Sequence, residues 1–237
     1  MTSATTTVST LPKQHTASEI TFSSNDKGLS VSIYTERLHI RSVQNTPEEL
    51  TRYASLFGDA MVMQTLAAGK TKTKGEVQDS IKRWVKRWKD QDPYSGLAVF
   101  ERTTNAFVGH VVLGHGESAG ESEIAYLLHH VHWKQGYGSE AVAALVKEYA
   151  LATMQRNYVT LDKKPLQKIV ATARRDNFAS CRILEKVGMC FVKDEYKYGA
   201  LRHFYSIDIQ RIQIITSCTN LTFDFSALCL AYALETA

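Results

Sequence analysis

The sequence of 237 residues contains little cysteine, little net charge and no long apolar run. Its four cysteines form no C-x-x-C pair, so neither a zinc ribbon nor a redox motif is predicted, and we expect reduced thiols in a cytoplasmic protein. No apolar stretch reaches the ~20 residues that cross a bilayer, and no basic start followed by an apolar stretch marks a secretory signal. The formal charge of +4 is small for a nucleic-acid binder. We therefore expect neither a membrane nor a nucleic acid as partner.

Hydrophobic residues make up 44% of the chain and charged residues 22%, as in an average globular protein. The first twenty or so residues are rich in serine and threonine, which predicts a loose tail. A hairpin is expected around Asn25-Asp26-Lys27-Gly28, at the end of an N-terminal segment that covers residues 1–30. We expect the main domain over residues 31–210 and an apolar extension over residues 211–237. The extension could add a strand and a docking helix or cover a subunit interface, and both a monomer and a homodimer remain open.

The apolar pattern predicts an α/β (α+β) protein. Alternation predicts strands over residues 35–43, 96–102, 106–115 and 122–130. Helices are expected from Thr46, where threonine caps and Pro47 fits the first turn, and over residues 73–89. Because only the later part of the chain alternates strands with helices, a mixed sheet with helices on its faces fits best. The later elements are a loop and helix over residues 132–152, a strand over 168–173, a helix over 177–188, and strands over 189–196 and 201–209.

The helix expected over residues 73–89 has an apolar stripe and a basic face. The basic face is either simply solvated or a wall that attracts an anionic ligand. The stripe contains Val77, Ile81, Trp84, Val85 and Trp88, and the outward bases are Lys82, Arg83, Lys86, Arg87 and Lys89.

The segment HWKQGYGSEA, residues 132–141, lies between a predicted strand and a predicted helix. Its two glycines let backbone N–H groups come close to a ligand. The amides of Gln135 to Ser139 and the positive end of the helix predict an anion site, to which Lys134 could add charge. Ser139 would cap the helix. No Gly-Lys-Ser/Thr follows and no third glycine has the required spacing, so neither a nucleotide-hydrolase phosphate loop nor a dinucleotide fingerprint fits.

This loop resembles the acyl-CoA pyrophosphate loop of the GNAT superfamily of N-acetyltransferases, Q/R-x-x-G-x-G/A, with Trp133 at the Q/R position. That departure resembles the branch of ribosomal-protein serine/alanine N-terminal acetyltransferases. TERLHIR at 35–41 resembles the first strand of that branch, and EIAYL at 123–127 its fourth-strand signature, with Ala125 for the usual glycine. Residues 177–189 resemble its N-x-x-S-x-x-x-L-E-K-x-G-F segment. The four matches follow the expected order.

The resemblance implies a mostly antiparallel twisted sheet whose fourth and fifth strands splay around acetyl-CoA. It implies direct transfer of the acetyl group to a primary amine, without a covalent enzyme intermediate. Leu127 or Leu128 would supply a backbone donor to the thioester carbonyl and pair with the pantetheine, with Val170 to Ala173 as the opposite lip. The cofactor-binding residues that it implies are Tyr126, Leu127, Leu128, Trp133, Lys134, Gln135, Gly136, Tyr137, Gly138, Ser139, Asn177 and Ser180.

The resemblance also implies roles in proton transfer. Ser180 would hydrogen-bond or protonate the leaving thiolate, because the tyrosine that many superfamily members carry one turn later is Leu184 here. Its other interpretation is a helical serine bonded to its own backbone. Asn177 would hold the pantetheine, cap the helix, or do both. Glu123 is either the base that deprotonates the amine or a plain strand-edge carboxylate. Further candidates for the base are Glu195, His203 and Tyr205.

Histidines gather near the loop, but no metal site is predicted. No cysteine or acidic residue has metal-ligand spacing to them, and strand alternation would point His129 and His130 to opposite faces. The other members of the group are His110, His115 and His132.

The acceptor amine and the activity itself have alternatives. A protein N-terminus, a polyamine and an aminoglycoside-type amine all fit an N-acetyltransferase, and the lack of an acidic run favours a protein or peptide N-terminus. A non-catalytic acyl-CoA-binding regulatory module is the alternative function, which Trp133 and Leu184 favour. Release of free thiol from acetyl-CoA in the presence of amines would distinguish the two.

Overall fold

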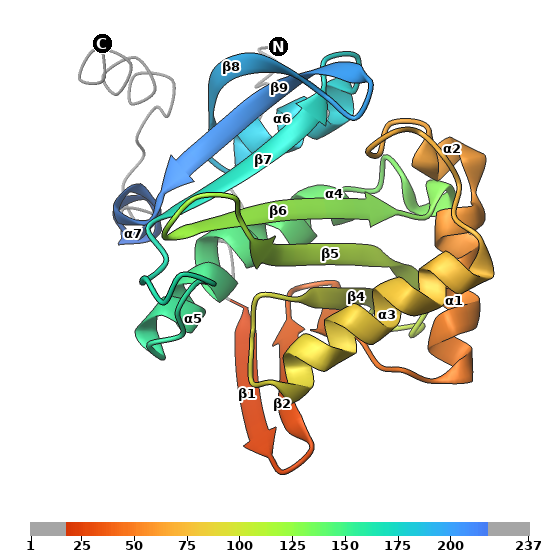
Figure 1. Cartoon of the computed structure of the whole chain (residues 1–237), viewed down its shortest axis with the longest axis horizontal. Coiled ribbons are helices and arrows are strands. Elements are labelled where there is room, and N and C mark those ends of the chain that lie inside the picture. Colours follow the sequence, from red (N-terminus) through yellow and green to blue (C-terminus); the bar gives the residue numbers. More distant parts are fainter. Residues whose placement is uncertain (1–17, 218–237) are drawn as a thin grey trace, which may run out of the picture.

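The computed structural model describes residues 18–217, which build a single sheet of nine strands (Figure 1). The strand order is β1-β2-β3-β4-β5-β6-β7-β9-β8. β6 and β7 run parallel, and every other neighbouring pair is antiparallel, which confirms the mixed sheet predicted. The strands are β1 (Glu19–Asn25), β2 (Gly28–Tyr34), β3 (Leu38–Ser42), β4 (Gly96–Glu101), β5 (Phe107–His115), β6 (Glu121–Leu128), β7 (Lys168–Arg174), β8 (Cys190–Lys197) and β9 (Ala200–Asp208).

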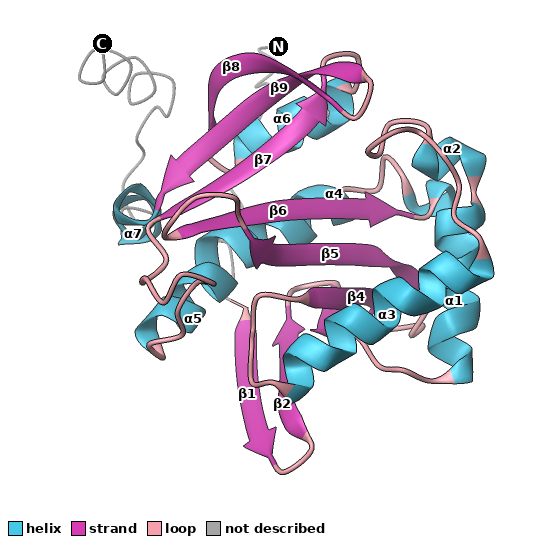
Figure 2. Ribbon diagram, in the orientation of Figure 1, coloured by secondary structure: helices cyan, strands magenta, loops and turns pink. Residues whose placement is uncertain are grey.

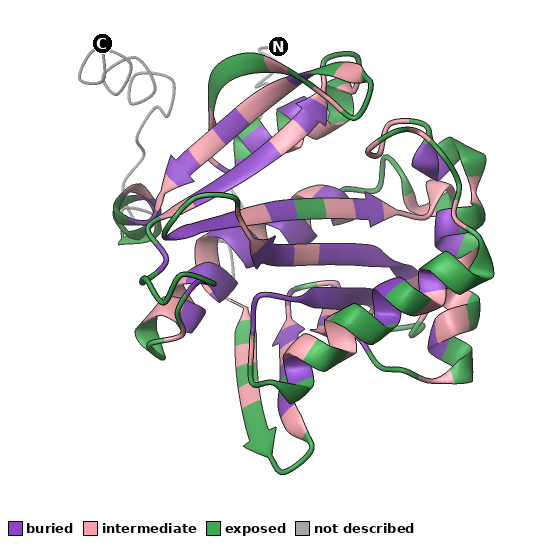
Figure 3. Cartoon of the chain, viewed as in Figure 1, coloured by how far each residue is buried: buried purple, intermediate pink, exposed green. Residues whose placement is uncertain are grey.

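Helices cover both faces of the sheet (Figure 2). α1 (Pro47–Gly58), α2 (Ala60–Met63) and α3 (Lys74–Lys89) lie on one face. The other face carries the larger core and the remaining longer helices, and the inner strand β4 is buried almost throughout (Figure 3). No helix within residues 18–217 is long and apolar enough to cross a membrane. The remaining helices are the 3₁₀ turn η1 (His130–His132), the continuous run of α4 (Tyr137–Ala143), the π-helical η2 (Ala144–Tyr149) and α5 (Ala150–Gln155), then α6 (Phe178–Lys186) and α7 (Ile209–Ser217).

The longer helices of the first face begin where the sequence predicts. Thr46 Oγ1 accepts a hydrogen bond from the Glu49 amide at 3.2 Å, and Pro47 is the first residue of α1. Thr73 and Glu76 form a reciprocal capping box at the start of α3. Side chains and backbone thus satisfy donors that a helix start otherwise leaves unpaired.

The apolar stripe of α3 packs against the rest of the protein, and most of its basic face is exposed. Arg87 is the exception. Its Nη1 atom donates to the Tyr94 carbonyl at 3.0 Å, and its side chain lines a cleft in the sheet. Arg87 adjoins the buried Trp88 at the edge of the stripe, so its assignment to the outward face was wrong.

The expected N-terminal hairpin forms, with Asn25 opposite Gly28. β2 also pairs with β3, so the hairpin extends the main sheet, and the expected boundary at residue 30 falls inside β2. The predicted hairpin is therefore confirmed, and it forms the first two strands of the sheet. Residues 1–17 lie outside the described part of the chain.

The first part of the expected C-terminal extension completes the domain. α7 buries Ile209, Ile212 and Ile215 against the larger core. The boundary expected at residue 210 therefore falls inside a packed helix. The rest of the extension, residues 218–237, lies outside the described residues together with two of the cysteines. The other two, Cys181 and Cys190, form no disulfide within the described part of the chain.

β6 and β7 separate soon after they pair. Their ladder comprises only Glu121 with Lys168, Ser122 with Ile169, and Glu123 with Val170. Beyond Glu123 the edge of β6 that faces β7 has no partner strand within residues 18–217, and Figure 1 shows the two strands diverging. The family's fourth-strand signature lies in β6, so β6 and β7 are the two strands that the resemblance expects to splay, and their separation confirms that expectation.

Gly109 in β5 lies too close to β6 to carry a side chain. A Cβ there would stand 2.4 Å from the Leu127 carbonyl oxygen and 2.8 Å from Leu128 Cα. We expect Gly109→Ala to lower the free energy of unfolding by about 1–3 kcal/mol, because β5 must move away from β6. Gly58→Ala is the control, since a Cβ at Gly58 meets nothing within 4 Å. Urea denaturation compares them, and equal stability would contradict this close packing.

Candidate active site

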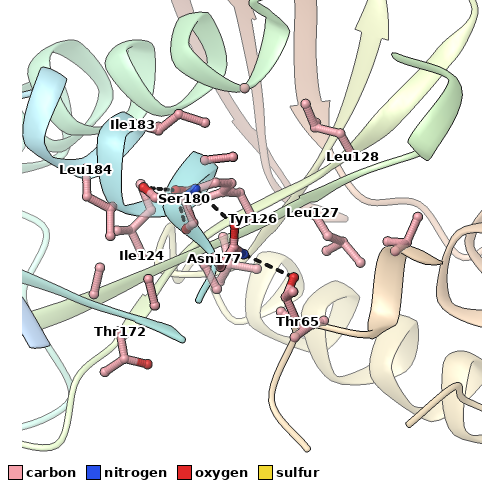
Figure 4. Close-up of a pocket in the computed structure, with 18 of the residues that line it drawn as sticks. Thr65, Ile124, Tyr126, Leu127, Leu128, Thr172, Asn177, Ser180, Ile183 and Leu184 are labelled. Atoms are coloured by element: carbon pink, nitrogen blue, oxygen red, sulfur yellow. Dashed lines mark hydrogen bonds between the residues drawn. The ribbon is translucent and has the colours of Figure 1, made fainter. Parts of the chain in front are cut away.

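The gap between β6 and β7 opens into a cleft of about 830 Å³ (Figure 4). Its walls come from α2 and the loop after it, from β5, β6 and β7, from the loop before α4, from α6, and from the β8–β9 turn. Of the cofactor-binding residues predicted from the sequence, Gln135 alone does not line it. The fold thus brings together residues far apart in the chain, such as Tyr126 and Ser180, which are 54 positions apart, and Thr65 and Asn177, which are 112 positions apart.

The glycine-rich loop places a helix start at one end of the cleft. Gly136 has a φ of 84°, in the left-handed region that glycine favours, and the helix begins at Tyr137 without a side-chain cap. Tyr137, Gly138 and Ser139 form the first helical turn and line the cleft. Amides in a first turn have no partner within the helix, and the helix dipole favours an anion there. The geometry therefore fits a diphosphate.

Three predictions for this loop need correction or detail. Ser139 lies inside the helix and is not its cap, because Gly136 turns the chain earlier. Gln135 uses its side chain on the Val131 carbonyl, at 3.0 Å. Trp133 lines the cleft, and its indole Nε1 donates to the Leu128 carbonyl at 2.8 Å, which fixes the end of β6.

A clamp that the sequence did not predict holds this loop. Arg37, in the turn between β2 and β3, donates to Glu140 Oε2 through Nε at 2.7 Å and to the Gln135 carbonyl through Nη1 at 2.8 Å. Its guanidinium also stands 4.7 Å from the centre of the Tyr137 ring. Glu140 accepts further bonds from the Arg37 amide and the Thr35 hydroxyl. Arg37 belongs to the TERLHIR segment, whose resemblance indicated only a strand.

The start of α6 supplies a hydroxyl to the other wall of the cleft. Asn177 Oδ1 accepts the Ser180 amide at 3.1 Å and so caps the helix, while its Nδ2 donates to Thr65 Oγ1 at 3.0 Å (Figure 4). Ser180 Oγ lies 2.8 Å from the Tyr126 hydroxyl. Burial raises the pKa of Tyr126 well above its ordinary value, so this phenol stays protonated and can donate. The cap confirms one of the two interpretations of Asn177.

Side chains alternate along β6, so Tyr126, which contacts Ser180, and the candidate base Glu123 point to opposite faces of the sheet. Tyr126 and Leu128 point to the α4 and α6 face, where they meet Ser180 and the first turn of α4. Leu127 belongs to the core cluster under α1 and α3, on the opposite face. Glu123 shares the parity of Leu127. Ser180 and Glu123 therefore reach the gap from its two sides.

Glu123 is the candidate base that the cleft retains. It lines the cleft, and burial raises the pKa of its carboxyl, an effect that Lys197 partly offsets. The other candidates lie outside the lining: His203 pairs with Asp194 at 2.6 Å, the Tyr205 hydroxyl donates to Glu185 Oε1 at 3.1 Å, and Glu195 faces β9.

The expected arrangement of the histidines was wrong. β6 ends at Leu128, so strand alternation does not apply to His129 and His130, whose rings lie 5.0 Å apart. His130 Nδ1 is hydrogen-bonded to Asp59, which lowers the pKa of that carboxyl. Asp59, His129 and His130 offer ligand atoms within 4.8 Å of one another and could hold a metal ion, but they lie outside the cleft lining.

Comparisons with known proteins agree with this geometry. Residues 37–190 match the family model of the acetyltransferase (GNAT) domain. The "Uncharacterized N-acetyltransferase YnaD" of Bacillus subtilis strain 168 is 27% identical over 183 residues, which cover 71% of this chain and 96% of the relative.

Solved structures share the fold. A GNAT-family acetyltransferase from Bacillus anthracis superposes with a TM-score of 0.60 at 22% identity, covering 75% of this chain and 98% of that one. RimL, a ribosomal alpha-N-protein acetyltransferase solved in complex with coenzyme A, superposes with a TM-score of 0.58 at 17% identity, covering 74% and 96%. The family match spans most of the described sheet and the whole glycine-rich loop. The chain therefore belongs to the GNAT acetyltransferase family.

Proposed function

We propose that this enzyme transfers an acetyl group from acetyl-CoA directly to a primary amine in the cytoplasm, with the N-terminus of a protein or peptide as the favoured acceptor. The observation that carries the proposal is the placement of Glu123 and Ser180 on opposite sides of the gap between β6 and β7. A transfer in one step needs a base on the side of the attacking amine and a donor on the side of the departing sulfur.

The cleft fits acetyl-CoA in shape and in chemistry. The first-turn amides of α4 would hold the diphosphate. The unpaired edge of β6 after Glu123 would bind the pantetheine as a neighbouring strand does. Acetyl-CoA supplies the acetyl group as a thioester. A backbone amide near Leu127 or Leu128 would donate to the carbonyl oxygen as charge develops there, which is worth about 3 kcal/mol in comparable sites.

The chain's own groups would then move two protons. An ammonium acceptor must lose two protons to become an amide nitrogen. Glu123 would accept the first, directly or through one water molecule, so that the neutral amine can attack. The second leaves the nitrogen as the C–S bond breaks and balances the proton that the departing thiolate takes up. Ser180 Oγ would donate to the departing sulfur. The Tyr126 hydroxyl lies 2.8 Å from Ser180 Oγ and 3.2 Å from the Ser180 carbonyl oxygen, and so holds the serine hydroxyl at the wall of the cleft. A thiol with a pKa of ~8.5 leaves with a hydrogen bond alone, so a stronger acid is not required.

Turnover tests the proposal. The full chain, acetyl-CoA and a panel of amines should release free thiol in proportion to N-acetylated product identified by mass. The panel includes serine- and alanine-initiated peptides, spermidine and an aminoglycoside. Thermal stabilisation by coenzyme A without thiol release on any amine would instead support the non-catalytic binding module.

Loss of the loop clamp should weaken cofactor binding more than it slows chemistry. We expect Arg37→Met to raise the KM for acetyl-CoA by about tenfold, because the loop loses charged hydrogen bonds from a partly exposed side chain. The kcat at saturating acetyl-CoA should change little. Arg156→Met is the matched control, since Arg156 follows the other end of the same continuous helix. An unchanged KM would show that the loop holds its shape without Arg37.

A further inference from the structure

Two arginine side chains line the cleft beside Glu123. Arg87 and Arg202 line this end together with Glu123, from α3, β9 and β6. Arg87 already donates to a backbone carbonyl. The neighbouring Lys197 donates to Glu117 at 2.8 Å. A polycation would meet two guanidinium groups here, which disfavours a polyamine as acceptor.

Arg202 is buried, and part of its hydrogen-bonding capacity is unused. Only 5% of the surface of Arg202 is exposed. Nε donates to Thr172 Oγ1 at 3.0 Å and Nη2 to the Thr172 carbonyl at 3.2 Å, which fixes the guanidinium against β7. Nη1 has no partner among the described residues. Because a guanidinium stays charged in proteins, the unused donors favour an oxygen acceptor from outside the chain.

The carboxylate of Glu195 lies across from Arg202, but the two side chains form no ion pair within the described part of the chain. Glu195 stands opposite Arg202 in the β8–β9 ladder, and its Oε1 atom also lacks a partner within the described chain. Glu195 lies outside the cleft lining, whereas Arg202 belongs to it. Of Glu195 and Arg202, only Arg202 borders the space where an acceptor must lie.

We propose that Arg202 binds a carboxylate or carbonyl oxygen of the acceptor while Glu123 receives its amine, so that the enzyme selects α-amino acyl compounds. This inference rests on the proposed acetyltransferase function. An α-amino acyl group carries its amine and its oxygen on adjacent carbons, so the two binding groups must be neighbours. Glu123 stands opposite Val170 of β7, and the Arg202 guanidinium is bonded to Thr172, two residues further along that strand and on the same face, so the two groups border the same stretch of the cleft. Polyamines lack such an oxygen, and Arg202 repels them.

Matched acceptors test the assignment. L-serine, a serine-initiated tripeptide amide and ethanolamine share an amino-alcohol group, but ethanolamine lacks the carboxyl carbon. Wild-type enzyme should prefer one of the first two. Arg202→Met should raise the KM for that preferred acceptor by about 10- to 100-fold, because a charged hydrogen bond is lost. The KM for acetyl-CoA should stay unchanged, and the loss on ethanolamine should be much smaller than the loss on the preferred acceptor. Preference for L-serine indicates a carboxylate, and preference for the tripeptide amide indicates a carbonyl.

Controls separate recognition from stability. Arg202→Lys keeps the charge and should restore part of the preference, whereas Lys193→Met removes an exposed charge from β8 and should change nothing. Melting temperatures of all variants show whether they fold. An equal loss on all three acceptors would indicate a structural role for Arg202 and overturn the assignment.

Binding of N-acetyl-L-serine gives a readout that needs no turnover. Calorimetry should show at least tenfold weaker binding to Arg202→Met than to wild type, and equal affinity would contradict the assignment. Wild-type turnover on spermidine or ethanolamine as fast as on L-serine and on the peptide would also overturn it, while leaving the acetyltransferase proposal intact. Failure to release thiol with every amine would contradict the proposed function itself.

Discussion

Replacing Glu123 with glutamine is expected to lower kcat by about 10²-fold or more at neutral pH, because the amine loses the base that takes its proton. The loss should shrink at high pH. An α-amine with a pKa near 8 is then already neutral and needs no base. Rates measured from pH 6 to pH 10 give this profile. A variant with wild-type rates over the whole range would remove Glu123 from the mechanism.

On the acidic side of the pH–rate profile, the activity of the wild-type enzyme should rise with pH. Burial raises the pKa of Glu123 above the ordinary value of 4.5, so activity should rise with pH through a value higher than 4.5. Glu123→Gln should lose that limb. Glu48→Gln is the matched control, since Glu48 is exposed on the first turn of α1 and should leave the limb in place.

Stability distinguishes a catalytic Glu123 from a structural one. Because the folded-state pKa is raised, protonated Glu123 favours folding. Its contribution is fully present below pH 4.5 and is lost as the pH rises through the folded-state value. At neutral pH the neutral glutamine should therefore fold at least as stably as wild type. A large fall in melting temperature together with the fall in kcat would point to a structural role.

Replacing Ser180 with alanine is the second change with a large expected effect. We expect kcat to fall about 10- to 100-fold, because the departing sulfur loses its hydrogen-bond donor. The helix should remain intact, since Asn177 still caps it through the backbone amide of residue 180. The KM for acetyl-CoA should change less than kcat, and steady-state kinetics with both substrates varied measures the split.

Tyr126 provides an independent check on the role of Ser180. Tyr126→Phe removes the hydroxyl that lies 2.8 Å from Ser180 Oγ and should cause a smaller loss than Ser180→Ala. If Tyr126 acts through Ser180, the double variant should be no worse than Ser180→Ala alone. Losses that multiply in the double variant would mean that the two hydroxyls act separately.

The sequence predicted the sheet, most of the helices and the cleft, because these follow from local patterns and from four motifs in order. Alternation at residues 96–130 identified β4, β5 and β6, and the caps at Thr46 and Thr73 identified two helix starts. The splay of β6 and β7 followed from the resemblance, and the three-pair ladder between them confirms it.

The errors have a common cause, which is that a local pattern does not show where an element ends or what it meets. The alternation assumed for His129 and His130 stops because β6 ends at Leu128. Ser139 has good capping chemistry, but Gly136 begins the helix before it. Arg87 lies at the edge of an apolar stripe, where the helical period alone gives no direction.

Partners far apart in the chain were beyond sequence patterns altogether. Arg37 and Glu140 are 103 positions apart, and the sequence around either residue indicates only a charged side chain on the surface. Asn177 and Thr65 are 112 positions apart, and their bond joins α6 to the loop after α2. Such pairs depend on the sheet order, which places β3 next to the helix that starts at residue 137.

A crystal structure of the full chain with coenzyme A tests the central claim most directly. We expect the diphosphate within about 3 Å of the backbone amides of Tyr137, Gly138 and Ser139. The pantetheine should run along the unpaired edge of β6, with its sulfur beside Ser180 Oγ. Coenzyme A bound on another surface, or a gap between β6 and β7 filled by the protein's own side chains, would contradict the account.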